Sequence, residues 1–577
     1  MNFLSKKLNQ KFISSALYAI TGVLLFIFLL NKAENTYNPY VKGDYHSSLF
    51  ADPGGYNVYL PGIFNGWFFG KVPAKADSIV GNGFIITENK KIITKYPYGV
   101  SLLQSPFYLG GKVYGKIAHR KFTGNNKLNQ QIVDWAGIFY FTIGVLLLFN
   151  FLKNISNYFI AIVSVVILTF GTNVYYYTVT AAGYSHIYSF FLFICLIIVS
   201  QQFFRGPTLR KALLLGFLCI AIILVRPLNT IVLPIILFLG INDKSEIFQR
   251  IKLLFTIKYL VPLVSIAVIF IIPQIMYYKW AFGSLLPDTY ENEGFTYLSH
   301  PKLKEVLFAP LSGLLTYAPV TFLLFISIII FCFIKKIEGI AILCIILLII
   351  YLSASWHSYA MGCSFGARVF VEFSVLLIIP FAHVSKRYLT HWISKVLIIA
   401  LIIYPINVTS SLARNFDVCF FGSSDWDWNE YNYLLHQKTK VIAINGNNDE
   451  YNNNDLISEP NNTTNKCFSS ANKDYVATIQ FPLNKINEVP IRMVGIKVDL
   501  KNASDSLNAE LAVQIMRNGK QVHYASTFIN NKSKDWFPVF FESYFPKDLQ
   551  LNDELKIFIL NKSKTSFYVD NYELKMR

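Results

Sequence analysis

The chain has 577 residues, of which 53% are hydrophobic, and its mean hydropathy is +0.40. This composition is too apolar for a soluble enzyme, and the apolar residues form runs long enough to cross about 30 Å of hydrocarbon. The net charge of +18 comes mainly from Lys and Arg in short connectors between these runs, and no basic patch interleaved with base-stacking aromatic residues is present. The sequence therefore argues against nucleic-acid binding and predicts an α-helical polytopic membrane protein.

The apolar runs predict about eleven membrane spans. They lie near residues 12–30, 132–150, 158–177, 187–204, 211–225, 227–241, 257–277, 313–334, 338–354, 368–384 and 393–411. The first run lacks a clear small-residue cleavage site, so we expect a retained helix and not a signal peptide. Basic residues flank both ends of 211–241, which predicts a hairpin with Arg226-Pro227 at its outer tip. The same charge bias places the amino terminus on the cytoplasmic side. We expect the membrane to be a bacterial inner membrane.

Three long segments fall on the outer side in this topology: residues 31–131, 278–312 and the tail from 412. Within the first segment, 56–70 and 98–118 are apolar and aromatic but are interrupted by Gly and Pro. This pattern is typical of helices that lie in the interface plane.

The tail begins with a connecting segment over 412–466 that ends in an Asn-rich linker. From 467 to 577, stretches such as YVATIQF and LNAELAVQIMR alternate apolar and polar residues between turn signals. This alternation predicts an outer β-sandwich, similar in pattern to carbohydrate-binding domains. The transmembrane module is expected to cover 1–411.

Two carboxylates in the first outer segment are candidate catalytic residues. Ionisable groups beside a bilayer are usually functional, and Asp52 or Asp44 could accept a proton from an acceptor hydroxyl or orient it. Asp52-Pro53 is also a good N-cap and first-turn pair for a helix that begins near Gly54, so the Asp52 oxygens could instead satisfy free N–H groups. Asp44 has no such capping position.

Three basic residues at the expected outer headgroup depth, Lys95, Arg226 and Arg368, are candidates for binding a lipid phosphate. Lys95 and Arg226 could instead be interfacial anchors. Arg368 opens a span in which Glu372 lies one turn deeper, where a charge is costly unless it is paired or used. An i,i+4 ion pair between Arg368 and Glu372 and anion binding by Arg368 are compatible readings.

Five residues are candidate substrate contacts: His186, His357, Glu372, Asp288 and Tyr96, which follows Lys95. The two His residues lack companions at metal-ligand spacing, so we expect polar packing or hydrogen bonds to substrate. Asp288 belongs to an acidic loop that could bind a divalent cation or sugar hydroxyls, or be solvated. No cofactor is certain, and a divalent cation stays open. Walker, GxGxxG and GxSxG motifs in a usable context are absent, and so is HExxH, which leaves nucleotide-driven pumping and serine hydrolysis unsupported.

With these residues in place, the chain resembles the GT-C superfamily of polytopic membrane glycosyltransferases, which includes protein O-mannosyltransferases and the aminoarabinose transferase acting on lipid A. The segments DPGGYNVYLPG, KYPYGVSLLQSPF, AAGYSHIYSFFLF, RPLN and SFGARVF are similar to those of uncharacterised bacterial members. The architecture over about residues 1–411 is similar as well, with a long first outer loop that carries an acidic residue and two interfacial helices.

The resemblance implies inverting transfer of a sugar from a polyprenyl-phosphate carrier to a glycan, lipid or protein acceptor. It assigns the base or acceptor-orienting role to Asp52, with Asp44 second, and the donor phosphate to Lys95, Arg226 and Arg368. Many members carry adjacent paired acids in the first loop, whereas Asp44 and Asp52 are separated here, so the choice of base stays open.

Two other functions remain alternatives. A flippase or transporter for a lipid-linked saccharide would also need basic residues near headgroups, but it should show internal repeats, and none is seen. A polysaccharide polymerase or ligase differs in whether its essential outer residues are Arg and His alone or include Asp52.

Overall fold

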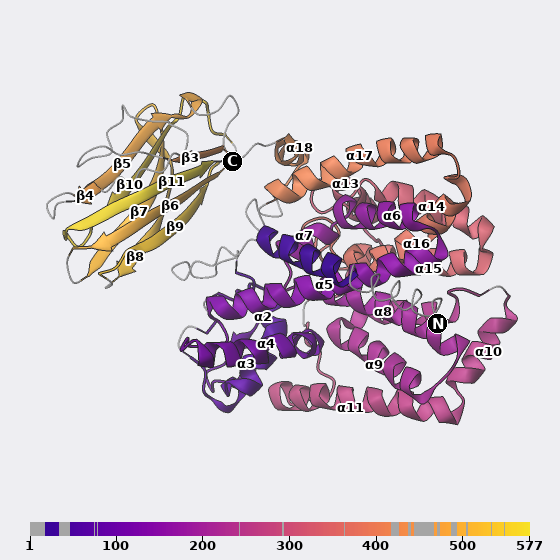
Figure 1. Ribbon diagram of the computed structural model, residues 1–577. Helices are drawn as coiled ribbons and strands as arrows, with labels where there is room; N and C mark the ends of the chain where they lie inside the picture. The colour runs from indigo at the N-terminus through magenta and orange to yellow at the C-terminus, as the bar shows by residue number, and fades with distance from the viewer. Residues whose placement is uncertain are drawn as a thin grey trace, which may run out of the picture. The chain divides into compact units, whose positions relative to one another are not determined.

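The computed structural model describes residues 18–33, 47–73, 76–77, 79–241, 243–290, 293–362, 364–416, 426–436, 440–443, 467–469, 474–485, 493–503, 506–531, 534–546 and 548–576. The chain forms two compact units, a helical one that includes Gly43–Leu435 and a β-rich one that includes His436–Arg577 (Figure 1). Each unit has its own hydrophobic core.

The helical unit is built from many apolar helices. In chain order they are Tyr18–Lys32, α2 (Asp52–Asn57), α3 (Tyr59–Phe64), the 3₁₀ helix η1 (Trp67–Phe69), α4 (Gly99–Ile117), α5 (Lys127–Ile155), α6 (Tyr158–Gly171), α7 (Val174–Val179), α8 (Ser185–Arg205), α9 (Leu209–Val225), the 3₁₀ helix η2 (Pro227–Leu237), α10 (Ser245–Leu254), α11 (Ile257–Phe282), α12 (Leu303–Phe308), α13 (Leu314–Tyr317), α14 (Thr321–Ile334), α15 (Lys336–Ser355), α16 (Phe370–Tyr388), α17 (Trp392–Asn415) and α18 (Trp428–His436). A short hairpin, β1 (Ile85–Ile86) and β2 (Ile92–Ile93), precedes α4.

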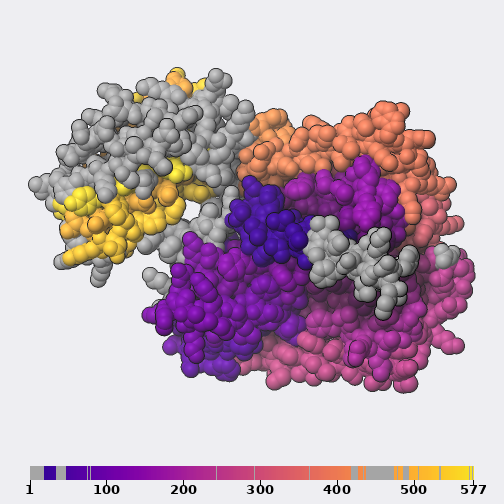
Figure 2. All heavy atoms as spheres, in the orientation of Figure 1, coloured from indigo at the N-terminus to yellow at the C-terminus, as the bar shows by residue number. Residues whose placement is uncertain are grey.

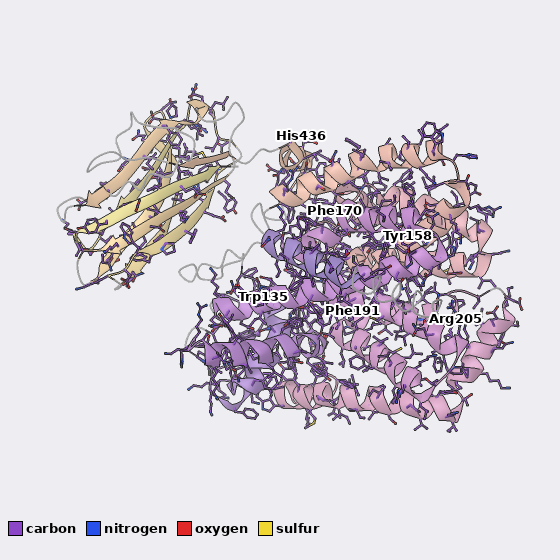
Figure 3. The ribbon with its side chains drawn as sticks, in the orientation of Figure 1. Trp135, Tyr158, Phe170, Phe191, Arg205 and His436 are labelled. Atoms are coloured by element: carbon purple, nitrogen blue, oxygen red, sulfur yellow. The ribbon has the colours of Figure 1, made fainter. Side chains whose placement is uncertain are left out.

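Five helices among the described residues, α5, α8, α11, α15 and α17, are long and apolar enough to cross a membrane. Several shorter apolar helices accompany them, so the predicted helical membrane module is confirmed, while the count of eleven spans stays a prediction. The exposed aromatic side chains of Trp135, in α5, and of Tyr158, the first residue of α6, are labelled in Figure 3. Exposed Trp and Tyr residues of this kind are typical of membrane–water interfaces.

The break at Arg226-Pro227 lies where the hairpin tip is predicted. Helix α9 ends at Val225 and η2 starts at Pro227, whose missing N–H costs nothing in a first turn. The two elements pack on each other and on α8.

The first outer segment folds into short helices around aromatic residues. The stretch predicted as one helix over 56–70 is instead divided into α2, α3 and η1, whereas 98–118 forms the single helix α4. The ring of Tyr59 in α3 lies 4.7 Å from that of Tyr277 in α11, and Figure 2 shows these two parts of the surface side by side. Helix α11 thus supports the outer segment.

The second unit is a two-sheet β-sandwich, as predicted (Figure 1). One sheet has the order β5-β10-β7-β8, and the other has the order β3-β11-β6-β9 with β4 beside β11. The strands are β3 (Lys440–Ala443), β4 (Cys467–Ser469), β5 (Tyr475–Pro482), β6 (Met493–Asn502), β7 (Leu507–Arg517), β8 (Lys520–Asn531), β9 (Phe537–Tyr544), β10 (Glu554–Leu560) and β11 (Phe567–Met576). Alternate residues of β7, from Leu507 to Ile515, are buried in the core because side chains alternate between the faces of a strand.

Candidate active site

The carboxylate of Asp52 takes part in two contacts from distant parts of the chain. The Tyr96 hydroxyl donates a hydrogen bond of 2.6 Å to Asp52 Oδ1. The Arg368 guanidinium forms an ion pair in which Nη2 lies 3.3 Å from Asp52 Oδ2. The capping role is wrong: α2 begins at Asp52, its N-cap is Ala51, and no side chain caps it. Asp52 is directed into a polar cluster and not at its own helix.

The backbone before Asp52 adopts an unusual conformation. Ala51 has φ 56° and ψ −129°, a region that a residue with a Cβ rarely occupies. Its N–H donates to Val80 O, and its carbonyl accepts from Gly54 and Gly55. Strained residues of this kind persist only where the surroundings fix them, and they are frequent next to functional groups.

Burial alone would raise the pKa of Asp52, but the guanidinium of Arg368 and the Tyr96 hydroxyl oppose it, with smaller effects of Arg226 and His186. Together they hold the pKa of Asp52 below its ordinary value of 3.8. The Asp52 and Arg368 side chains are each 16% exposed. Asp52 is therefore a charged carboxylate at neutral pH, at a site that is mostly but not wholly shielded from solvent.

A second group of charges lies beside the first. Glu372 Oε2 is 2.8 Å from His186 Nδ1, and both side chains are fully buried. Arg226 Nη1 is 3.0 Å from His186 Nε2. The predicted Arg368–Glu372 pair is wrong, because Arg368, which precedes the first residue of α16, Phe370, is directed to Asp52 instead. Arg368 pairs with Asp52, and Glu372 pairs with His186.

The ends of several helices converge here. His186 is in the first turn of α8, Glu372 is in the first turn of α16, and Arg226 follows the last residue of α9. Helix amino termini carry partial positive charge, so α8 and α16 add to the field of the arginines. Gly99 at the start of α4 permits a close approach to α9, because a Cβ there would lie 2.4 Å from the Leu224 carbonyl carbon.

Lys95 lies on one side of this cluster and is already paired. Its Nζ is 2.6 Å from Glu293 Oε2 in the second outer segment. The ammonium is also 5.1 Å from the Tyr290 ring centroid and 5.6 Å from that of Tyr96. Lys95 therefore links the two outer segments next to Asp52, and its predicted contact with a phosphate stays a prediction.

The remaining candidates have other partners or lie outside the described residues. The His357 backbone N–H donates to Gly294 O, and its ring centroid is 5.1 Å from that of Trp356. Asp288 is exposed and accepts from the backbone N–H of Tyr290. Asp44 lies outside the residues that the structure describes. Within the described residues, no three His, Cys, Asp or Glu side chains gather as metal ligands would.

One buried carboxylate was missed by the sequence reasoning. Asp134 in α5 accepts a 2.7 Å hydrogen bond from the Ser48 hydroxyl, and Gln130 accepts from the Ser48 backbone N–H. These contacts attach the chain just before Ala51 to α5. An acidic residue inside an apolar run was a usable signal, because such a charge is costly in a membrane.

Comparisons with known proteins return structures but no sequence relatives. No protein-family model matches the chain, and no curated protein matches it. The apo oligosaccharyltransferase of Archaeoglobus fulgidus is similar with a TM-score of 0.40 and 13% identity, over 77% of this chain and 62% of that one. The same organism's oligosaccharyltransferase AglB, solved with an inhibitory peptide and a dolichol-phosphate, gives 0.42 and 12%, over 78% and 62%.

The chain spans 62% of the length of these structures.

Proposed function

We propose that this protein is a membrane glycosyltransferase that moves a sugar from a polyprenyl-phosphate-linked donor to a glycan, lipid or protein acceptor on the extracytoplasmic face. The observation that carries the proposal is the ion pair of Asp52 with Arg368, beside Arg226, at the meeting point of the helix ends. A carboxylate can accept a hydrogen bond and then the proton from an attacking hydroxyl, and guanidinium groups can bind the oxygens of a departing phosphate.

The proposed reaction is a single displacement. The acceptor oxygen forms a bond to the anomeric carbon while the bond from that carbon to the phosphate oxygen breaks. The hydroxyl proton passes to the Asp52 carboxylate, and the polyprenyl phosphate leaves with the bonding electron pair. Arg226 and Arg368 stabilise the charge that develops on the leaving phosphate, and one displacement inverts the anomeric configuration.

The low pKa of Asp52 defines how it acts. A carboxylate with a pKa below 3.8 is a weak base towards a resting hydroxyl. Its charge is nevertheless available throughout the reaction, and the acceptor oxygen becomes acidic only once its bond to the sugar is forming. Asp52 thus orients the hydroxyl first and takes up the proton late, while its charge also stabilises the oxocarbenium-like sugar.

Roles for the outlying candidates follow from their positions. Tyr96 holds Asp52, and Lys95 is available to a donor phosphate once its pairing with Glu293 opens. His357 and Asp288 are assigned to the acceptor side, where sugar hydroxyls would be bound. The β-sandwich is proposed to recruit the acceptor, with the membrane module performing the transfer.

The function is tested with the purified full chain in lipid nanodiscs, supplied with a panel of synthetic polyprenyl-phosphate monosaccharides. We expect one donor to be consumed with release of polyprenyl phosphate, and nuclear magnetic resonance of the product should show the inverted anomer. Movement of intact donor across vesicles without release of polyprenyl phosphate would identify a transporter instead and would overturn the proposal.

A further inference from the structure

Two contacts connect three residues, from α16 through α8 to the end of α9, and the transfer step proposed above uses only the last of them, Arg226. Glu372 Oε2 is 2.8 Å from His186 Nδ1. Arg226 Nη1 is 3.0 Å from His186 Nε2 and 3.4 Å from Nδ1, so this end of the guanidinium lies over the face of the imidazole ring. Glu372 and His186 are fully buried, whereas Arg226 is 16% exposed. The buried end of this series of contacts is therefore fixed, and the partly exposed end is a cation.

These contacts define the protonation of His186. An ionised carboxylate only accepts hydrogen bonds, so Nδ1 carries a hydrogen and donates to Glu372. Arg226 Nη1 lies within 3.4 Å of both ring nitrogens, and a cation over the ring disfavours a second positive charge on it. The contacts therefore favour the neutral tautomer in which Nδ1 carries the hydrogen.

The His186 ring also prevents a tight pairing of Glu372 with Arg226. A carboxylate and a guanidinium in direct contact form bidentate hydrogen bonds of about 2.7 to 2.9 Å, and the arginine is then less available to another anion. Here the nearest approach of Glu372 Oε1 to Arg226 Nε is 3.7 Å, and Oε2 is bonded to His186 instead. The charge of Glu372 attracts the guanidinium of Arg226 without forming a bidentate pair, so N–H groups of Arg226 remain available to another anion.

We infer that Glu372 and His186 are a positioning pair that fixes the guanidinium of Arg226 for the donor phosphate. The inference rests on the proposed function. An arginine side chain has many rotamers, and ordering it costs conformational entropy at the moment of binding. The face of the neutral His186 ring against Nη1, and the charge of Glu372 at 3.7 Å from Nε, order the guanidinium beforehand.

The test compares His186→Gln with His186→Leu in the purified full chain. A Gln side chain has an N–H₂ group that can donate to Glu372 and a planar amide that can lie against the guanidinium of Arg226, whereas Leu can do neither. Farnesyl phosphate is the binding probe, and turnover with the active donor is measured alongside. We expect His186→Gln to weaken farnesyl phosphate binding about threefold and His186→Leu to weaken it about 30-fold or more, the loss typical of a charge-assisted hydrogen bond.

Two outcomes would overturn the inference. One is equal loss of binding in the two variants, and the other is unchanged binding with equal loss of kcat, which would make His186 a proton-transfer residue. Should His186→Leu fail to give a monodisperse protein, a double-mutant cycle replaces it: Arg226→Lys should weaken probe binding less in the His186→Gln background than in the wild type, and additive effects would overturn the pairing. A wild type that binds the probe but transfers no sugar contradicts the proposed function alone.

Discussion

Arg368 Nη2 lies 3.3 Å from Asp52 Oδ2, which joins the segment before α16 to the first residue of α2. The pair brings a cation suited to phosphate and a carboxylate suited to a hydroxyl into one partly buried place. Because the Tyr96 hydroxyl occupies the other carboxylate oxygen, the position of Asp52 is fixed from two sides. The predictions below test what this arrangement does.

Replacing Arg368 by Gln should raise the pKa of Asp52. Burial already acts to raise it, and Arg368 is the largest of the opposing influences. In the wild type Asp52 stays ionised until the pH falls below its ordinary pKa of 3.8, so the acidic limb of kcat against pH should lie below that value. In Arg368→Gln the limb should move to higher pH, and a pH–rate profile measures it.

The same shift has a consequence for stability. Because the folded-state pKa of Asp52 is lowered, the Asp52–Arg368 contact stabilises the protein above the unfolded pKa and loses that contribution as the pH falls through the folded value. If the acidic limb of kcat lies at the same pH in the wild type and in Arg368→Gln, a group other than Asp52 controls that limb.

Replacing Gly99 by Ala should impair the site from outside it. The added Cβ would lie 2.4 Å from the Leu224 carbonyl carbon and 2.5 Å from the Val225 nitrogen, so the end of α9 must move and Arg226 with it. Donor KM should rise about tenfold or more, because an error of about 1 Å in a binding group is costly. Gly110→Ala in the same helix is the control, since nothing lies within 4 Å of a Cβ there and activity should be kept.

The ion pair of Lys95 with Glu293 gives opposite predictions for its two members. If Lys95 binds the donor phosphate, Glu293 competes for it, so Glu293→Gln should tighten donor binding about two- to fivefold while Lys95→Ala weakens it. Isothermal titration with farnesyl phosphate measures both affinities. Equal weakening in the two variants would mean that the pair only holds the outer segments together.

The sequence predicts the fold well where the signal is local. Long apolar runs identify the helical membrane module, and alternation identifies the β-sandwich, because each pattern is imposed directly by burial. The single helix expected over 56–70 was divided in the structure, where η1 follows the left-handed Gly66. Such a backbone conformation is not visible in hydropathy.

The candidate site was predictable as a set of residues but not as a set of contacts. Asp52, Arg226, Arg368, His186 and Glu372 were all recognisable as polar groups at costly positions near a bilayer. Their partners come from distant segments, so sequence spacing carries no information about the pairing. The expectation that Arg368 meets Glu372 failed because Arg368 pairs with Asp52, which is distant in the sequence. The conformation of Ala51 has no sequence signal at all.

The central claim is that the carboxylate of Asp52 takes up the acceptor proton, and Asp52→Asn tests it most directly. The amide keeps the size of the side chain and can still accept from Tyr96, but it cannot take up a proton. Asp77→Asn, at an exposed position of the same outer segment, is the control for removing one negative charge.

The measurement is turnover of the purified proteins with the active donor at saturating concentration. We expect Asp52→Asn to lose about 10²- to 10⁴-fold in kcat, with Asp77→Asn unchanged. Asp52→Asn that turns over at close to the wild-type rate, while it elutes and unfolds like the wild type, would contradict the account.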